Sequence, residues 1–237
     1  MPTVTIPTSS GAMDAYLAIP KTDGPSPAVL IVHDALGMTT DLRHQADWLA
    51  GADFLALAPN LYHWGSRMRC LFTALKAVTT KRGRTFEDLE AAHDWVTDRD
   101  DCTGKIGVIG YCLGGGFAEL LASMSDYAAS SVNYGSVDDP DTVLVDACPI
   151  VASYGGRDRS LRKAPQQLET ALTTHGIEHE IKVYPDAGHA FLNDHAPGEM
   201  PTWARIAGSF ANAGYHEPSA IDARKRIVSF FDAHLRP

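Results

Sequence analysis

A cysteine lies between two glycines in the segment Gly110-Tyr111-Cys112-Leu113-Gly114, which has the form G-x-C-x-G. A short apolar run precedes this segment and a helical pattern follows it, so the cysteine is expected in a tight turn between a buried strand and a helix. The serine version of the pattern is a nucleophile elbow, a strained turn that lifts a reactive side chain clear of a sheet. The spacing therefore predicts that Cys112 is a nucleophile.

The residue types around Cys112 suit that chemistry. Gly110 and Gly114 have no Cβ atom, so they leave room for a strained residue between them. The first turn of the following helix has free N–H groups and the positive end of the helix dipole, which stabilise a thiolate and an oxyanion. One alternative is a buried cysteine at a glycine-rich helix start. A dinucleotide-binding loop is disfavoured, because the G-x-G-x-x-G spacing is absent.

Two later loops supply the partners that such a nucleophile needs, namely a base and a carboxylate that orients the base. Asp158 follows an apolar run at residues 149–154, and His189 follows another at residues 178–184. Taken alone, an aspartate in a glycine-rich loop is typical of a turn, and a loop histidine is typical of a surface. The chain order nucleophile, acid, histidine is that of α/β-hydrolases, so the three together favour a Cys112–His189–Asp158 triad.

Alternating strand and helix patterns must position these loops. Continuous apolar runs predict strands covered on both faces, and longer amphipathic stretches predict helices between them. Strands are expected at residues 28–32, 54–58, 105–110, 129–134, 149–154 and 178–184, with an opening hairpin over 4–6 and 15–19. Helices are expected at residues 40–50, 71–78, 86–96, 113–123, 161–175 and 221–235. This order predicts a mostly parallel sheet with helices on both faces, as one α/β-hydrolase-fold domain over residues 1–237.

Several segments resemble the dienelactone hydrolase (carboxymethylenebutenolidase) family. They are GYCLGG at 110–115, GGRD at 155–158, AGHAF at 187–191, VHDALG at 32–37 and APNLY at 58–62. The resemblance extends from residue 28 to the C-terminal helix. It implies an α/β-hydrolase fold and a Cys-His-Asp triad that cleaves a lactone or an activated ester through a thioester, without a metal or cofactor.

The resemblance also implies roles for residues near the nucleophile. The family usually has a glutamate after the first core strand, and its carboxylate contacts the resting thiol and helps to deprotonate it. Asp34 stands at that place, one methylene shorter, and is a fourth catalytic candidate. The backbone N–H groups of Leu113 and Ala35 are the expected oxyanion hole.

The substrate-binding residues depart from the dienelactone-cleaving members, which hold a substrate carboxylate with two arginines. Neither arginine is present at the matching places, so a carboxylate-bearing lactone is expected to have little advantage over a neutral one. Arg67 or Arg69 could substitute from the irregular stretch that follows, or could be a solvated surface cation. The residues expected to contact substrate are Tyr62, His63, Trp64, Phe191 and Asn193.

Composition excludes several classes of protein. The chain has 237 residues, of which 45% are hydrophobic and 21% charged, and a net charge of −9, which disfavours a nucleic-acid partner. The first residues do not resemble a signal peptide, and the apolar runs are too short to span a bilayer. The four cysteines form no C-x-x-C pair. These features predict a cytoplasmic protein. A monomer or a weak homodimer is the expected assembly, although no sequence feature determines it.

Two alternative functions remain open at this point. His189, Asp194 and His195 could suggest a metal site, but their spacing fits no standard one. A non-hydrolytic protein on the same scaffold, either redox-responsive or ligand-binding, is the competing hypothesis, because fold alone does not determine function. Turnover of an activated ester distinguishes the hydrolase from the binding protein.

Overall fold

An eight-stranded sheet runs through the computed structural model, which describes residues 3–124, 126–196 and 198–236. The strand order is β1-β2-β4-β3-β5-β6-β7-β8. β1 pairs antiparallel with β2, and β2 with β4, whereas every pair from β4 to β8 is parallel. The strands are β1 (Thr3–Thr8), β2 (Gly11–Ala18), β3 (Ser26–Val32), β4 (Leu55–Pro59), β5 (Cys102–Tyr111), β6 (Ala129–Asn133), β7 (Ile150–Gly155) and β8 (His179–Tyr184). The prediction of a mostly parallel sheet is confirmed.

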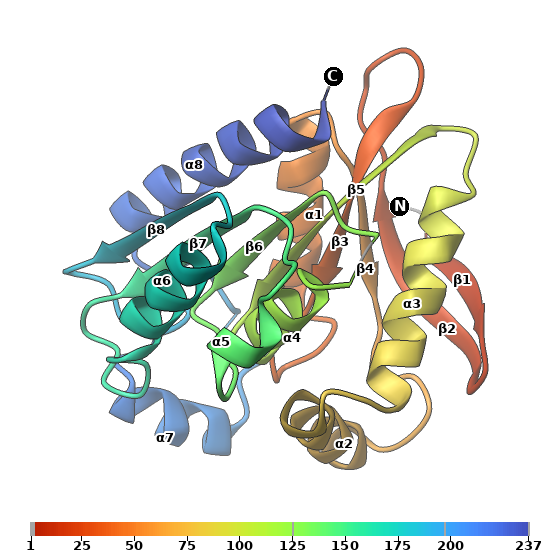
Figure 1. The fold of residues 1–237 in the computed structure, drawn as a ribbon. Helices are drawn as coiled ribbons and strands as arrows, with labels where there is room; N and C mark the ends of the chain where they lie inside the picture. Colours follow the sequence, from red (N-terminus) through yellow and green to blue (C-terminus); the bar gives the residue numbers. More distant parts are fainter. Residues whose placement is uncertain (1–2, 125, 197, 237) are drawn as a thin grey trace.

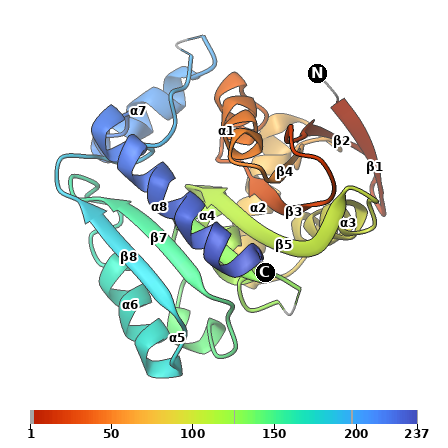
Figure 2. The same ribbon diagram turned by 90° about the horizontal axis from the view of Figure 1, so that it is seen from above.

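Helices cover both faces of this sheet (Figure 1). α1 and α8 pack in one apolar core, and α2, α3, α4 and α6 contribute to the other. Figure 2 shows α8 lying across its face of the sheet. The helices are α1 (Thr40–Gly51), α2 (Arg67–Thr80), α3 (Arg84–Thr97), α4 (Leu113–Leu121), α5 (Pro140–Val143), α6 (Ala164–His175), α7 (Thr202–Phe210) and α8 (Glu217–Leu235). All seven residues of β3 are buried, as expected for a strand covered on both faces.

Most predicted elements are present with ends displaced by a few residues, but α5 and α7 were not predicted. α7 lies apart from the helices that flank the sheet (Figure 1). Ile206 and Phe210 are exposed on it, so these apolar side chains are not buried against the sheet. Among the described residues, no helix is long and apolar enough to cross a membrane.

The parallel strands bring the predicted reactive residues to one edge of the sheet. Asp34 follows β3, Cys112 follows β5, Asp158 follows β7 and His189 follows β8. The carboxyl ends of parallel strands meet at the same edge, and this is where open α/β sheets bind ligands. The topology therefore places all four side chains in one region.

Candidate active site

Cys112 occupies a strained turn between β5 and α4. Its backbone has φ 55° and ψ −113°, a conformation that non-glycine residues rarely adopt. The two flanking glycines are required by close backbone contacts. A Cβ atom at Gly110 would lie 1.9 Å from the carbonyl oxygen of Gly114, and one at Gly114 would lie 2.1 Å from that of Val32. The G-x-C-x-G spacing is thus the local condition for presenting Cys112 at the end of the strand.

The loops that carry Asp158 and His189 pack backbone against backbone. A Cβ atom at Gly155 would lie 2.3 Å from the carbonyl oxygen of Gly188. The N–H of Arg157 donates to the carbonyl of Ala187 at 2.9 Å. These contacts explain why glycines precede both Asp158 and His189, and they hold the two side chains within reach of each other.

His189 connects Cys112 to Asp158. Its Nδ1 donates to Asp158 Oδ2 at 2.6 Å, and the imidazole also hydrogen-bonds the Cys112 side chain. Because Nδ1 faces Asp158, Nε2 is the nitrogen left for the sulfur. Asp158 is only 3% exposed, and its Oδ1 accepts hydrogen bonds from the backbone N–H and the hydroxyl of Ser160 at 2.9 and 2.5 Å. Both carboxylate oxygens are therefore bonded.

The electrostatics of this triad favour a charged histidine. Burial alone would lower the pKa of His189, but the charge of Cys112 and the hydrogen bonds to Asp158 and Cys112 outweigh it and raise the pKa to about 10. Burial would raise the pKa of Asp158, but the hydrogen bonds from His189 and Ser160 prevail, so the pKa of that carboxyl is lowered. An imidazolium beside a cysteine is an environment that stabilises a thiolate.

A pocket of about 370 Å³ opens over Cys112 and His189. The turn after β3 contributes one side, and α7 with its flanking residues contributes an apolar wall. The lining residues are Asp34, Ala35, Leu36, Cys112, Ser160, His189, Ala190, His195, Met200, Ala204, Gly208, Phe210, Ala211 and Ala213. A larger hollow of about 750 Å³ lies between β2 and α1, but it is lined by neither a cysteine nor a histidine. The smaller pocket is therefore the candidate active site.

The two predicted oxyanion donors lie beside this pocket. Ala35 lines it, and Leu113 is the first residue of α4. A backbone N–H in the first turn of a helix has no acceptor within that helix, so it is free to bind an anion. Their role stays a prediction.

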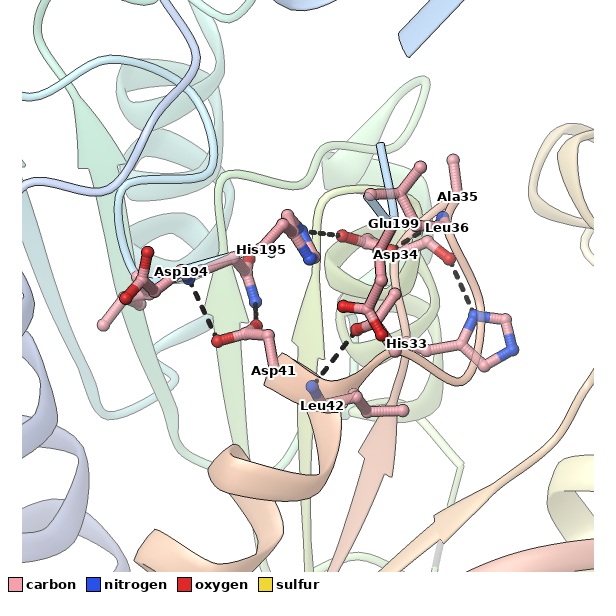
Figure 3. A network of polar contacts seen from close by, with 12 residues as sticks. His33, Asp34, Ala35, Leu36, Asp41, Leu42, Asp194, His195 and Glu199 are labelled. Atoms are coloured by element: carbon pink, nitrogen blue, oxygen red, sulfur yellow. Dashed lines mark hydrogen bonds and ion pairs between the residues drawn. The ribbon is translucent and has the colours of Figure 1, made fainter. Parts of the chain in front are cut away.

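Asp34 reaches the pocket but does not hold the thiol. It is 8% exposed, and its Oδ1 accepts a hydrogen bond from the backbone N–H of Leu36 at 2.7 Å. Its Oδ2 lies 2.8 Å from Nε2 of His195 (Figure 3). The hydrogen bonds and ion pairs of the described residues thus connect Asp34 to Leu36 and His195 rather than to Cys112, unlike the glutamate contact implied by the resemblance.

His195 is a site residue that the sequence suggested only as part of a rejected metal site. It lines the pocket, and its pairing with Asp34 outweighs burial and raises the pKa of its imidazole. No group of three or more histidine, cysteine or acidic side chains among the described residues could hold a metal ion. Spacing along the chain cannot reveal the pair, because its two members belong to loops after different strands.

Two predicted substrate contacts are corrected by the structure. Phe191 is fully buried and packs against the rings of Tyr134 and Tyr184, with centroids 5.5 and 5.0 Å away. Asn193 is also buried, donates to Asp41 Oδ2 at 2.6 Å and accepts from the Tyr134 hydroxyl. The loop after His189 turns both side chains into the protein interior, where they cannot contact a substrate.

The three predicted contacts after β4 lie outside the pocket lining. The Tyr62 hydroxyl donates to the carbonyl of Ala35 at 3.3 Å, so this side chain stabilises the turn after β3 without lining the pocket. His63 pairs with the buried Asp88 at 3.2 Å. The guanidinium groups of Arg69 and Arg84 both lie over the Trp64 ring, 5.2 and 4.4 Å from its centroid.

The two arginines that could replace the missing ones lie in different places relative to the pocket. Arg69 stacks on Trp64, away from the pocket lining. Arg67 donates a hydrogen bond to the carbonyl of Leu36, at the margin of the pocket. Arg67 is therefore the better placed of the two to meet an anionic substrate.

Sequence reasoning missed the apolar wall that faces the reactive groups. Ala204 and Phe210 contribute to it from α7, and Met200 contributes from the segment just before that helix. The segment that follows α7 is bonded to the triad, because His189 donates its backbone N–H to the carbonyl of Ala211 at 3.1 Å and its carbonyl accepts from the N–H of Gly214 at 3.0 Å. The apolar residues of α7 recur at helical spacing, but this periodicity does not indicate which surface the helix lies against.

Comparison with known proteins identifies the family. The family model described as "Dienelactone hydrolase family" matches residues 13–235. A Yersinia pestis protein named "Putative carboxymethylenebutenolidase" is 29% identical over 252 residues, which cover 97% of this chain and 87% of that protein. A Klebsiella pneumoniae crystal structure titled "Putative Dienelactone Hydrolase" superimposes with a TM-score of 0.80 at 27% identity, over 98% of both chains.

A more distant structure shows the shared fold alone. The acylaminoacyl peptidase of Pyrococcus horikoshii superimposes with a TM-score of 0.74 at 14% identity, over 99% of this chain and 41% of its own. The α/β-hydrolase architecture predicted from the strand and helix pattern is thereby confirmed.

Proposed function

The chain belongs to the dienelactone hydrolase family and is an ester or lactone hydrolase, and from that premise we propose that Cys112 is its nucleophile. His189 serves as general base and acid, and Asp158 orients His189. One observation carries the proposal: His189 is bonded both to Asp158, at 2.6 Å, and to a cysteine held in a strained strand-to-helix turn. Covalent acyl transfer requires this arrangement, in which hydrogen bonds connect a nucleophile, a base and an orienting carboxylate.

The first half of the reaction forms a thioester. The Cys112 thiolate attacks the carbonyl carbon, and a bond between sulfur and carbon forms. The backbone N–H groups of Ala35 and Leu113 hold the oxyanion, and losing one such donor typically costs about 3 kcal/mol of transition-state stabilisation. As the carbonyl re-forms, the bond from carbon to the leaving oxygen breaks. The leaving oxygen departs with the proton of the His189 imidazolium.

The second half restores the enzyme. Neutral His189 removes a proton from water, and the resulting hydroxide attacks the thioester carbon. The bond between carbon and sulfur breaks, the carboxylic acid leaves, and the sulfur returns as thiolate beside the imidazolium. Asp158 keeps Nδ1 protonated throughout and so holds Nε2 towards the reacting atoms.

The pocket favours particular substrates for this chemistry. Its α7 wall is apolar, and the carboxylate of Asp34 is also part of the lining. An apolar wall suits a neutral acyl group, and it offers no polar partner to a substrate carboxylate. A thiolate also acylates best when the leaving group is good, as in an enol ester. The proposed substrates are therefore enol lactones and activated esters, with no requirement for a free carboxylate.

The nucleophile is tested with Cys112→Ala and an activated ester such as p-nitrophenyl acetate. Turnover should fall by about 10³-fold or more, because a triad loses most of its activity with its nucleophile. Cys102→Ala is the matched control, since Cys102 is also partly exposed but does not line the pocket. Mass spectrometry of the wild type quenched during turnover should find the acyl group on Cys112.

Selective alkylation gives an independent check. Burial raises the pKa of the Cys70, Cys102 and Cys148 thiols, the last to about 12, so iodoacetamide should modify Cys112 first. One equivalent of label on Cys112 should remove activity. Full turnover in Cys112→Ala, or inactivation by label on another cysteine, would overturn the assignment.

A further inference from the structure

Asp34 and His195 form a second histidine–carboxylate pair in the pocket, outside the triad. We propose that this pair is a positioning device that holds the turn around Ala35, so that its backbone N–H stays aimed at the oxyanion. The inference rests on the proposed function, because it concerns the acyl-transfer step at Cys112. It assigns Asp34 a different task from that of a thiol-activating carboxylate.

Asp34 closes the turn that contains Ala35. Its side chain accepts the N–H of Leu36 at 2.7 Å, and its backbone carbonyl accepts the N–H of Gly37 at 3.2 Å. Such an aspartate turn fixes the peptide groups between its ends. Ala35 lies within this turn and lines the pocket. The orientation of its N–H therefore depends on where the Asp34 carboxylate is held.

His195 holds that carboxylate from the other side. Its Nε2 donates to Asp34 Oδ2 at 2.8 Å. Both side chains are nearly buried, with 7% of the His195 side chain and 10% of the Asp34 side chain exposed. Within the described part of the chain, Nδ1 of His195 is buried and has no hydrogen-bond partner. The pair with Asp34 is thus the polar contact that the imidazole makes, and removing it would leave a buried group unpaired.

The segment that carries His195 is fixed on both sides of it (Figure 3). Asp41 accepts hydrogen bonds from the Asn193 side chain at 2.6 Å and from the Asp194 backbone N–H at 3.0 Å. Glu199 Oε1 accepts from the backbone N–H and the hydroxyl of Thr40 at 2.9 and 2.8 Å. Thr40 and Asp41 belong to the first turn of α1, so this one turn holds the segment on both sides of His195.

This geometry opposes direct action of Asp34 on the thiol. Each carboxylate oxygen already has a hydrogen-bond partner, and turning towards Cys112 would break a buried, charge-assisted hydrogen bond. The carboxylates of Asp41 and Glu199 also face His195 and, together with Asp34, favour its charged form. The pair therefore acts on the oxyanion turn, and His189 remains the base next to the sulfur.

Two reactions of Cys112 distinguish positioning of the oxyanion turn from activation of the thiol. Ester acylation forms an oxyanion and needs the Ala35 N–H, whereas alkylation by iodoacetamide needs the thiolate but forms no oxyanion. In His195→Ala and Asp34→Asn, kcat for p-nitrophenyl acetate should fall by about 10- to 100-fold, somewhat less than for complete loss of an oxyanion donor. KM should change little, and the rate and pH profile of alkylation should match those of the wild type.

Further variants exclude a general loss of structure. His195→Gln places an amide donor near the position of Nε2 and should recover much of the lost kcat. The double variant Asp34→Asn/His195→Ala should cost no more than the more damaging single change, because the two residues act as one unit. His44→Ala, an exposed histidine on α1, is the matched control and should behave as wild type.

Three results would overturn the proposal. One is an alkylation pH profile that shifts in Asp34→Asn in step with turnover, which would make Asp34 a thiol-activating group. Another is an unchanged kcat in His195→Ala, and a third is a full additive loss in the double variant. Failure of the proposed function is distinguishable, since it would appear as turnover that survives Cys112→Ala.

Discussion

At the scale of single residues, the chemistry depends on the state of one imidazole. His189 is buried enough that its charged form would be unfavourable alone, yet it lies between two groups that stabilise that form. Asp158 contributes from Nδ1, and Cys112 contributes through its charge and a hydrogen bond. The protonated imidazole is therefore maintained by the nucleophile as well as by the carboxylate.

This dependence predicts a change in the titration of His189. In Cys112→Ala the charge and the hydrogen bond of the sulfur are lost, while burial and Asp158 remain, so the pKa of His189 should fall below about 10. Because the pKa of a base is lowered, the imidazole should lose its proton at a lower pH. NMR titration of the His189 ring measures the midpoint, and Cys102→Ala should leave it in place. An identical midpoint in Cys112→Ala and the wild type would show that the sulfur does not stabilise the imidazolium.

At the scale of elements, turns with close backbone contacts position the reactive groups. The elbow brings the start of α4 against the end of β3, since a Cβ atom at Gly114 would collide with the carbonyl of Val32. The loops after β7 and β8 meet in the same manner at Gly155 and Gly188. Glycine is needed at these places because any side chain would push two backbones apart.

Substituting one of these glycines should therefore be costly. Gly114→Ala places its Cβ 2.1 Å from a backbone oxygen, so the free energy of unfolding should fall by about 3 kcal/mol or more, at the upper end of overpacking effects. Gly51→Ala is the matched control, because that Cβ would meet nothing within 4 Å at the end of α1. There alanine should stabilise the protein by about 0.5–1 kcal/mol. Urea unfolding measures both, and equal stability of the two variants would refute the steric argument.

At the scale of the whole molecule, charge acts on the substrate before it binds. The chain carries a net charge of −9. A negative protein repels an anionic substrate at distances up to the Debye length, which is about 30 Å at 10 mM salt and about 8 Å at 0.15 M. Arg67, bonded to the carbonyl of Leu36, is the cation that could oppose this repulsion at the pocket margin.

The salt dependence of kcat/KM should therefore differ between an anionic and a neutral substrate. For a carboxylate-bearing lactone, kcat/KM should rise several-fold as salt increases from about 10 mM to 0.15 M, because repulsion is screened. For its methyl ester it should stay constant. A fall with salt for the free acid, abolished in Arg67→Ala, would show instead that Arg67 attracts the carboxylate.

The sequence by itself determined the features that depend on neighbouring residues. Apolar runs and amphipathic stretches predicted the strands and most helices, because periodicity is a local property. The glycines around Cys112 predicted the strand-to-helix turn for a steric reason that acts within five residues. The order of Cys112, Asp158 and His189, each after a predicted strand, then implied that parallel pairing would gather them at one edge.

Only the tertiary structure decided which side chains contact one another, and which line the pocket, at that edge of the sheet. Asp34 and His195 are far apart in the sequence, and their pairing depends on how the loops after β3 and β8 meet. Phe191 and Asn193 lie close to His189 in the chain, yet the loop turns them inward, and residues on and beside α7 line the pocket instead. Short-range spacing fixes which residues can be reactive, but contacts between distant segments fix their partners. Those contacts are set by packing of the whole chain, which no local pattern encodes.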